Sequence, residues 1–229
     1  MRDVLIFGAG PLGRLAHDIL RQQDARVIAF ADDEQAGAEI EGVPVVCVHE
    51  AVRRRNGHAV VAIEDAATRI EFAHMASRHG FELLSAIHPL ASIAPSARIG
   101  RPVLIGARAT ICVHAEIGDH CVISSGAIVE HDNTLGVGVF LAPAVRLAGG
   151  VTVEDFARLG IGSCVIPYRR IGRLAVVAPG SVVIRDVYPM TMVSGVPARL
   201  TRRAEARFVP DLMRPAVPAA ELAAGASTA

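Results

Sequence analysis

Ile117-Gly-Asp-His-Cys-Val-Ile-Ser-Ser-Gly-Ala-Ile-Val-Glu-His-Asp-Asn-Thr-Leu135 is one stretch of the pattern that decides the fold of most of the chain. Every sixth residue in it is aliphatic, and the phase holds through sixteen consecutive sixth positions, from Ile93 to Val183. Heptads and α-helices cannot sustain a period of six residues. The pattern therefore predicts a triangular parallel β-helix, in which each hexapeptide forms one side and eighteen residues form one coil. We expect it to run without an external loop over residues 93–188.

The aliphatic residue of each hexapeptide points into the prism, and a small residue four positions later fits a tight corner. Burial of each aliphatic side chain stabilises the fold by roughly 1.5 to 3 kcal/mol. This ladder alone can hold a domain together.

The first 88 residues carry a different pattern, in which short apolar runs alternate with helical stretches. Such alternation predicts a parallel sheet with crossover helices. We expect strands over 4–7, 26–30, 43–47, 58–63 and 81–85, with helices over 11–22, 48–55 and 66–79.

The predicted fold class is thus an α/β Rossmann-like domain followed by an all-β parallel β-helix. The predicted boundaries are 1–88 for the α/β domain, 89–202 for the β-helix and 203–229 for a C-terminal tail. We expect packing near Phe208 and disorder at the end of this tail.

Composition excludes several classes of protein. The chain has 23 basic and 23 acidic residues, which argues against a nucleic-acid partner, and every basic residue is arginine, which excludes lysine nucleophiles and Schiff bases. Apolar runs fall short of the roughly 20 residues of a membrane span, so we expect a cytoplasmic protein. The four cysteines form no CxxC pair, so neither disulfides nor a zinc site is expected.

Gly8-Ala-Gly-Pro-Leu-Gly13 follows the first predicted strand and opens the first helix. Backbone N–H groups and the start of the helix can hold a diphosphate, and an acidic residue such as Asp32 or Asp33, at the end of the second strand, can bind a ribose or base. A dinucleotide needs a second half, for which this domain leaves little room. We therefore predict that Gly8, Gly10, Gly13, Asp32 and Asp33 bind a nucleotide-linked sugar; NAD binding and a purely structural turn are the alternatives.

His131 lies two residues after an inward-pointing aliphatic, so its side chain points away from the prism. It is a candidate general base, with Asp132 to orient the imidazole; a solvated surface pair is the alternative. One coil further, Gly149 leaves room for a thioester and offers an N–H to an oxyanion, unless it is only a permissive turn. His114, one coil before Asp132, either shares its carboxylate or is solvated.

These motifs, followed by Ser194-Gly-Val-Pro-Ala-Arg199, resemble the sialic-acid O-acetyltransferase and bacillosamine or perosamine N-acetyltransferase family of hexapeptide-repeat sugar acyltransferases. The likeness covers about residues 3–202 and is carried by five pieces: Phe7-Gly-Ala-Gly-Pro-Leu-Gly13, Phe30-Ala-Asp-Asp33, Ile87-His-Pro89, Val129-Glu-His-Asp132 and Gly195-Val-Pro-Ala198.

The resemblance implies a homotrimer of left-handed β-helices, with acetyl-coenzyme A in the groove between neighbouring subunits. It also implies that His131 and Asp132 match the catalytic His-acid pair of the family. The residues that it implies for the cofactor are Ile161, Gly162, Pro179, Gly180 and, near the adenine, Pro197. The chain departs from the family at Phe140, where the bacillosamine enzymes carry a cofactor-contacting histidine, and at Glu64, where glycine is frequent.

We therefore predict an acetyl-CoA-dependent enzyme that N-acetylates a nucleotide-linked amino sugar, without a metal. The alternatives are O-acetylation of a sugar hydroxyl, a non-catalytic binding or scaffold protein, and a carbonic-anhydrase-like zinc enzyme. Zinc needs three converging ligands, whereas His114, His120 and His131 fall on different sides or offsets of the prism.

Overall fold

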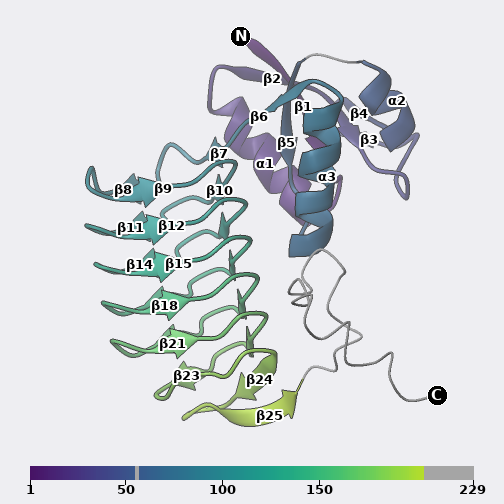
Figure 1. Ribbon diagram of the computed structural model, residues 1–229. Helices are drawn as coiled ribbons and strands as arrows, with labels where there is room; N and C mark the ends of the chain where they lie inside the picture. Colours follow the sequence, from purple (N-terminus) through teal and green to yellow (C-terminus); the bar gives the residue numbers. More distant parts are fainter. Residues whose placement is uncertain (55–56, 204–229) are drawn as a thin grey trace, which may run out of the picture.

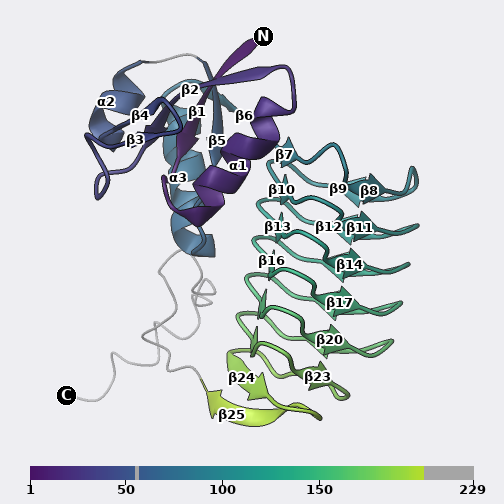
Figure 2. The same ribbon diagram turned by 180° about the vertical axis from the view of Figure 1, so that it is seen from behind.

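The computed structural model describes residues 1–54 and 57–203. The expected packing near Phe208 and the expected C-terminal disorder lie outside the described residues. Figure 1 shows an α/β part beside one end of a long stack of coils, and Figure 2 shows the same arrangement from behind.

The α/β part is built on a six-stranded sheet with the order β3-β4-β2-β1-β5-β6, in which only β3 is antiparallel to its neighbour. Its strands are β1 (Arg2–Phe7), β2 (Ala25–Ala31), β3 (Glu39–Ile40), β4 (Val43–Val46), β5 (Gly57–Val61) and β6 (Phe81–Leu83). Its helices are α1 (Pro11–Arg21), α2 (Val48–Arg53) and α3 (Ala66–Arg78). The predicted Rossmann-like pattern of strands and helices is confirmed, and the two-residue β3 is the one strand that it omitted.

The sheet is buried on both faces because alternate residues of the central strands point to opposite sides. Val4 and Ile6 pack with residues of α1, whereas Leu5 and Phe7 pack with residues of α2 and α3. Two helical layers thus cover the sheet, one on each face.

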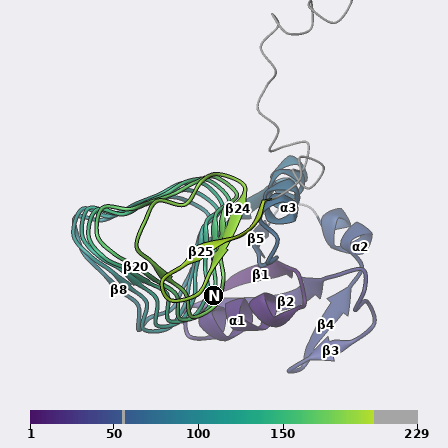
Figure 3. The ribbon, with the colours of Figure 1, turned by 90° about the horizontal axis from the view of Figure 1, so that it is seen from below.

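The rest of the described chain is a parallel β-helix with three sheets, ordered β25-β24-β22-β19-β16-β13-β10-β7, β23-β20-β17-β14-β11-β8 and β21-β18-β15-β12-β9. Seen from below, it has a triangular outline, and the α/β part lies along one side (Figure 3). Most of its strands have two residues: β7 (Ala86–Ile87), β8 (Ser92–Ile93), β9 (Arg98–Ile99), β10 (Leu104–Ile105), β11 (Thr110–Ile111), β12 (Glu116–Ile117), β13 (Val122–Ile123), β14 (Ile128–Val129), β15 (Thr134–Leu135), β16 (Phe140–Leu141), β17 (Arg146–Leu147), β18 (Thr152–Val153), β19 (Arg158–Leu159), β20 (Cys164–Val165), β21 (Arg170–Ile171), β22 (Val176–Val177) and β23 (Val182–Val183). The antiparallel pair β24 (Thr191–Ser194) and β25 (Arg199–Arg203) follows the last coil.

Residues eighteen positions apart pair throughout the stack, as Ile105 pairs with Ile123 and Ile111 with Val129. The inward aliphatic residues form one continuous buried cluster from Val103 to Val193. The described coils contain neither a helix nor an external loop between β8 and β23, so the predicted uninterrupted β-helix is confirmed.

Two corners of the prism carry the candidate site residues of the β-helix. We call the turns at residues 94–96, 112–114, 130–132, 148–150 and 166–168, which join the β8–β23 sheet to the β9–β21 sheet, the His131 corner. We call the turns at 106–108, 124–126, 142–144, 160–162 and 178–180, which join the β7–β24 sheet to the β8–β23 sheet, the Gly162 corner. Every one of these turns except 94–96 places its last residue at positive φ, as in Asp132 (58°) and Gly150 (68°).

The α/β part is fixed to the β7–β24 sheet of the prism. Outward residues of this sheet, among them Leu104 and Val122, share a buried cluster with Leu20 of α1. Arg69 of α3, only 3% exposed, donates hydrogen bonds to the carbonyls of Ile63, Glu64, His120 and Gly138 at 2.7, 2.9, 3.1 and 3.2 Å. Burial lowers the pKa of Arg69 to about 10, so the guanidinium stays charged at neutral pH. It joins the loop after β5 to two coils of the β-helix.

Candidate active site

His131 lies in the turn between β14 and β15, and its side chain is 50% exposed. Its Nδ1 is 2.8 Å from Oδ2 of Asp132. A carboxylate accepts hydrogen bonds only, so this contact assigns the proton to Nδ1 and leaves Nε2 as the basic nitrogen. The imidazole thus has the tautomer that a general base needs.

Asp132 contacts a second histidine. Nδ1 of His114, one coil earlier, is 3.4 Å from Oδ1 of Asp132. The pKa of Asp132 is lowered first by the hydrogen bond from His131 and to a lesser degree by His114. The carboxylate therefore stays ionised and lies between two imidazole rings.

Gly149 lies against the His131 ring. A Cβ at Gly149 would lie 2.4 Å from Nε2 of His131, so glycine leaves space for the imidazole in this position. In the described part of the chain, the N–H of Gly149 has no hydrogen-bond acceptor. An N–H without an intramolecular acceptor is available to an oxyanion.

The three glycines of the first turn differ in their surroundings. A Cβ at Gly8 would lie 2.7 Å from the carbonyl oxygen of Ala62, and one at Gly13 would lie 2.0 Å from that of Gly8. Close packing therefore requires both. Around Gly10, with φ of −71°, a Cβ would meet no atom within 4 Å. The open side of the turn is at Gly10.

The two aspartates after β2 hold backbone groups in place. Asp32 accepts a hydrogen bond from the N–H of Ala9 at 2.9 Å, which fixes the glycine turn. Asp33 accepts one from the N–H of Val48 at 2.8 Å, at the start of α2. Asp32 thus contacts the turn directly, whereas the hydrogen bond of Asp33 is to α2.

The residues predicted to bind the cofactor lie at the Gly162 corner in successive coils. Ile161 is 55% exposed, and a Cβ at Gly162 or Gly180 would meet no atom within 4 Å. Pro179 is exposed in the next coil, and Gly195, two residues before the exposed Pro197, accepts a hydrogen bond from Val182 at 3.1 Å. The structure thus brings these five residues into one column.

Within one chain, the glycine turn and His131 do not meet. The α/β part packs on the β7–β24 sheet, whereas the His131 corner joins the other two sheets (Figure 3). The described chain therefore holds the two groups of candidate residues, which we call candidate half-sites, on different sides of the prism.

Both departures from the family pattern meet in one cluster that the sequence did not reveal. Phe140 is 8% exposed, and the Arg158 guanidinium lies 4.3 Å from its ring centroid. Arg158 also forms an ion pair with Glu64. Glu64 directly follows Ala62 and Ile63, which lie against Gly8. The contact of Phe140 with Arg158 could have been predicted from their spacing of eighteen residues, because residues at this spacing pair in adjacent coils. No sequence pattern indicated the role of Arg69, because its partners in the β-helix, His120 and Gly138, lie 51 and 69 residues away.

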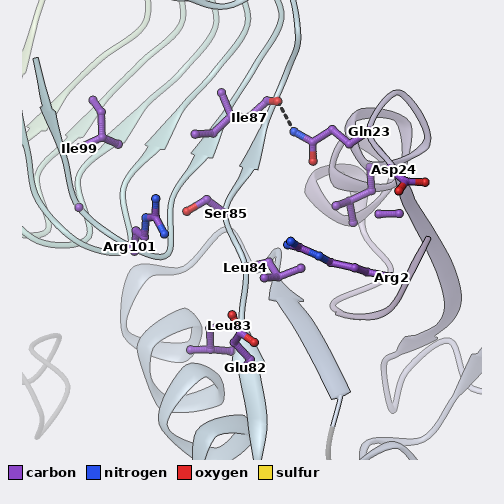
Figure 4. Close-up of a pocket in the computed structure, with 13 residues that line it drawn as sticks. Arg2, Gln23, Asp24, Glu82, Leu83, Leu84, Ser85, Ile87, Ile99 and Arg101 are labelled. Atoms are coloured by element: carbon purple, nitrogen blue, oxygen red, sulfur yellow. Dashed lines mark hydrogen bonds between the residues drawn. The ribbon is translucent and has the colours of Figure 1, made fainter. Parts of the chain in front are cut away.

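A pocket of about 660 Å³ opens away from all of these residues, between the start of β1, the end of α1 and the first coils (Figure 4). Arg2, Glu82 and Arg101 line it, and Gln23 donates a hydrogen bond to the carbonyl of Ile87 at 2.7 Å beside it. None of the predicted site residues belongs to this pocket.

The described residues contain no cluster of three or more His, Cys, Asp or Glu side chains placed to hold a metal ion. No helix within 1–54 or 57–203 is long and apolar enough to cross a membrane.

An α/β part, a hexapeptide β-helix and a His-Asp pair at its corner define the class of hexapeptide-repeat acyltransferases. Residues 3–76 match the model of the PglD N-terminal domain family. The chain is 38% identical to PerB from Caulobacter crescentus, solved with CoA and GDP-perosamine; the match covers 87% of this chain and 97% of that one, with a TM-score of 0.82. The chain belongs to the sialic-acid O-acetyltransferase, bacillosamine and perosamine N-acetyltransferase family of hexapeptide-repeat sugar acyltransferases, and its β-helix is left-handed.

Two further comparisons fit this assignment. The acetyltransferase domain of PglB from Neisseria gonorrhoeae, in complex with acetyl coenzyme A, is 25% identical, with a TM-score of 0.80 and coverage of 87% of this chain and 99% of that one. An acyl-[acyl-carrier-protein]–UDP-N-acetylglucosamine O-acyltransferase of Sinorhizobium fredii is 40% identical over 85 residues, which is 37% of this chain and 32% of the relative. The chain thus spans about a third of the length of the relatives of this kind that it matches.

Proposed function

We propose that the protein is an acetyl-CoA-dependent N-acetyltransferase of a nucleotide-linked amino sugar, with His131 as general base. The observation that carries the proposal is the convergence of His131, Asp132 and Gly149 at one corner of this family's fold.

In the proposed reaction, Asp132 accepts the Nδ1 hydrogen bond and His131 Nε2 takes a proton from the sugar amine. The amine nitrogen attacks the thioester carbonyl, a C–N bond forms, and the N–H of Gly149 stabilises the oxyanion. The C–S bond then breaks, and the proton passes from His131 to the sulfur of CoA. The products are an amide and free CoA.

The acceptor is proposed to bind at the glycine turn, where the open side at Gly10 and the start of α1 face a diphosphate. The tight packing around Gly8 and Gly13 and the hydrogen bond from Ala9 to Asp32 support this, because they fix the turn before any ligand arrives. PerB, which is similar over 87% of this chain, was solved with GDP-perosamine.

A homotrimer is proposed because one chain keeps its half-sites apart. The glycine turn of one subunit would serve His131 of its neighbour, with acetyl-CoA between them along the Gly162 corner. Exposed Ile161 and the open Gly162 and Gly180 support that groove.

The test combines binding with turnover. The purified chain is screened by thermal shift against GDP, UDP, dTDP and CoA, since a ligand that binds the folded state raises the melting temperature. Matching nucleotide-linked amino sugars are then assayed with acetyl-CoA by release of free thiol. We expect CoA and one nucleotide to stabilise the protein and an amide product to form. Transfer to a hydroxyl alone would favour O-acetylation, binding without turnover would favour a scaffold, and activity lost with EDTA would favour a metal enzyme.

A further inference from the structure

Tyr168 lies at the His131 corner, two coils beyond Asp132, and is 73% exposed. Its ring contacts the preceding coil. A Cβ at Gly150 would lie 2.6 Å from Cδ1 and 2.7 Å from Cε1 of Tyr168, so the ring lies against Gly150, along the corner toward the base.

Gly149 and Gly150 therefore contact two rings that approach from opposite directions. The imidazole of His131 reaches forward to Gly149, and the phenol of Tyr168 reaches back to Gly150. The coil that carries the proposed oxyanion donor thus has the base on one side and an aromatic face on the other. Ile166, 37% exposed in the same turn as Tyr168, extends the apolar surface.

The position of Tyr168 along the prism indicates which ligand it contacts. Tyr168 lies in the same coil as Ile161 and Gly162, and the other residues proposed to line the acetyl-CoA groove, Pro179, Gly180 and Pro197, follow further along the prism. In the proposed trimer, the His131 corner of one subunit faces the Gly162 corner of its neighbour at this level. The tyrosine is therefore at the level of the proposed acetyl-CoA groove.

We propose that the ring of Tyr168, with Ile166, binds the pantetheine arm of acetyl-CoA next to its thioester and holds the carbonyl carbon between His131 and Gly149. The inference rests on the proposed function. The pantetheine arm is flexible and carries methyl and methylene groups beside its amides, and these groups can pack on the face of an aromatic ring.

The chain offers a direct optical test, since it contains no tryptophan and only two tyrosines, Tyr168 and Tyr188. In the full-length Tyr188→Phe variant, Tyr168 is the sole strong fluorophore. The probe is S-acetylpantetheine, which lacks the adenine that would absorb the excitation light. We expect a saturable change in tyrosine emission in Tyr188→Phe and none in Tyr168→Phe, whose remaining Tyr188 is 78% exposed at another corner.

Kinetics provide the second measurement. Tyr168→Ala should raise the KM for acetyl-CoA about tenfold, as expected for loss of about 1.4 kcal/mol, with little change in the KM for the nucleotide sugar. Tyr168→Phe should behave like wild type, because the ring face and not the hydroxyl carries the contact. Tyr188→Ala is the matched control and should leave both constants unchanged.

Two results would overturn the inference: unchanged emission of Tyr188→Phe at S-acetylpantetheine concentrations that displace bound CoA, or a Tyr168→Ala variant that raises only the KM for the sugar. The emission change needs no turnover. An emission change without acetyl transfer therefore counts against the proposed function alone, and turnover without an emission change counts against Tyr168 alone.

Discussion

The two parts of the molecule form their half-sites in different ways. In the α/β part, backbone and carboxylates fix the turn, as Gly13 packs on Gly8 and Asp32 binds Ala9. In the β-helix, each coil repeats the same corner, and His131 and Asp132 project from a frame that their neighbours already determine. Substitutions in the α/β half-site should therefore impair folding or ligand binding. Substitutions in the β-helix half-site should instead impair catalysis while the protein stays folded.

The largest expected effect is on the β-helix side of this comparison. His131→Ala should lower kcat by roughly 10² to 10⁴, because it removes a positioned proton acceptor, with a modest effect on KM. Steady-state kinetics measure it, with His49→Ala as the control, since His49 is an exposed histidine in α2. A folded His131→Ala variant that binds both ligands and turns over within about threefold of wild type would place the base elsewhere.

On the α/β side, Gly13→Val should destabilise the protein by about 1 to 3 kcal/mol. A Cβ there would lie 2.0 Å from the carbonyl oxygen of Gly8, so α1 must shift away from the turn. Thermal unfolding of the full chain measures the loss. If the melting temperature of Gly13→Val equals that of wild type, the close packing at this turn is not what holds α1.

The matched substitution at Gly10 separates an effect on ligand binding from an effect on folding. Gly10→Val should lower the melting temperature far less than Gly13→Val, because a Cβ meets no atom within 4 Å and φ is −71°, so that only the weaker N-cap preference of valine remains. It should nevertheless raise the KM for the nucleotide sugar about tenfold, since the side chain enters the space proposed for the diphosphate. The KM for acetyl-CoA should stay unchanged, and equal weakening of both substrates would contradict the assignment of separate half-sites.

The difference between the repetitive β-helix and the α/β part, which has no repeat, also explains what the sequence could predict. A period of six allows spatial neighbours to be counted, so the outward position of His131 and its neighbours Gly149 and Asp132 follow from arithmetic. The contact of His114 with Asp132 was one of two alternatives, and the 3.4 Å separation supports a shared carboxylate.

No period connects the α/β part to the prism, so the sequence could not predict which sheet it packs on. Arg69 lies 51 residues from His120, and Arg158 lies 94 from Glu64. These contacts depend on how two surfaces fit. The hydrogen bonds of Asp32 and Asp33 to backbone were missed for a related reason, since a motif gives a residue's place in a turn but not which atoms it holds.

The smallest expected effect tests His114, which binds the orienting carboxylate without facing Gly149. In His114→Gln, the pKa of Asp132 should rise partway toward its ordinary value of 3.8, since the larger contribution, the hydrogen bond from His131, remains. An acid with a lowered folded-state pKa contributes stability above its unfolded-state pKa and loses it as the pH falls through the folded-state pKa. The variant should therefore unfold at a slightly higher pH than wild type in an acid titration followed by circular dichroism, with His49→Gln unchanged. At neutral pH its kcat should stay within about threefold of wild type, because Asp132 is ionised in both proteins and still orients His131. A loss of kcat as large as that of His131→Ala would instead make His114 part of the proton transfer, and an acid midpoint shifted to lower pH would show that its contact with Asp132 destabilises the corner.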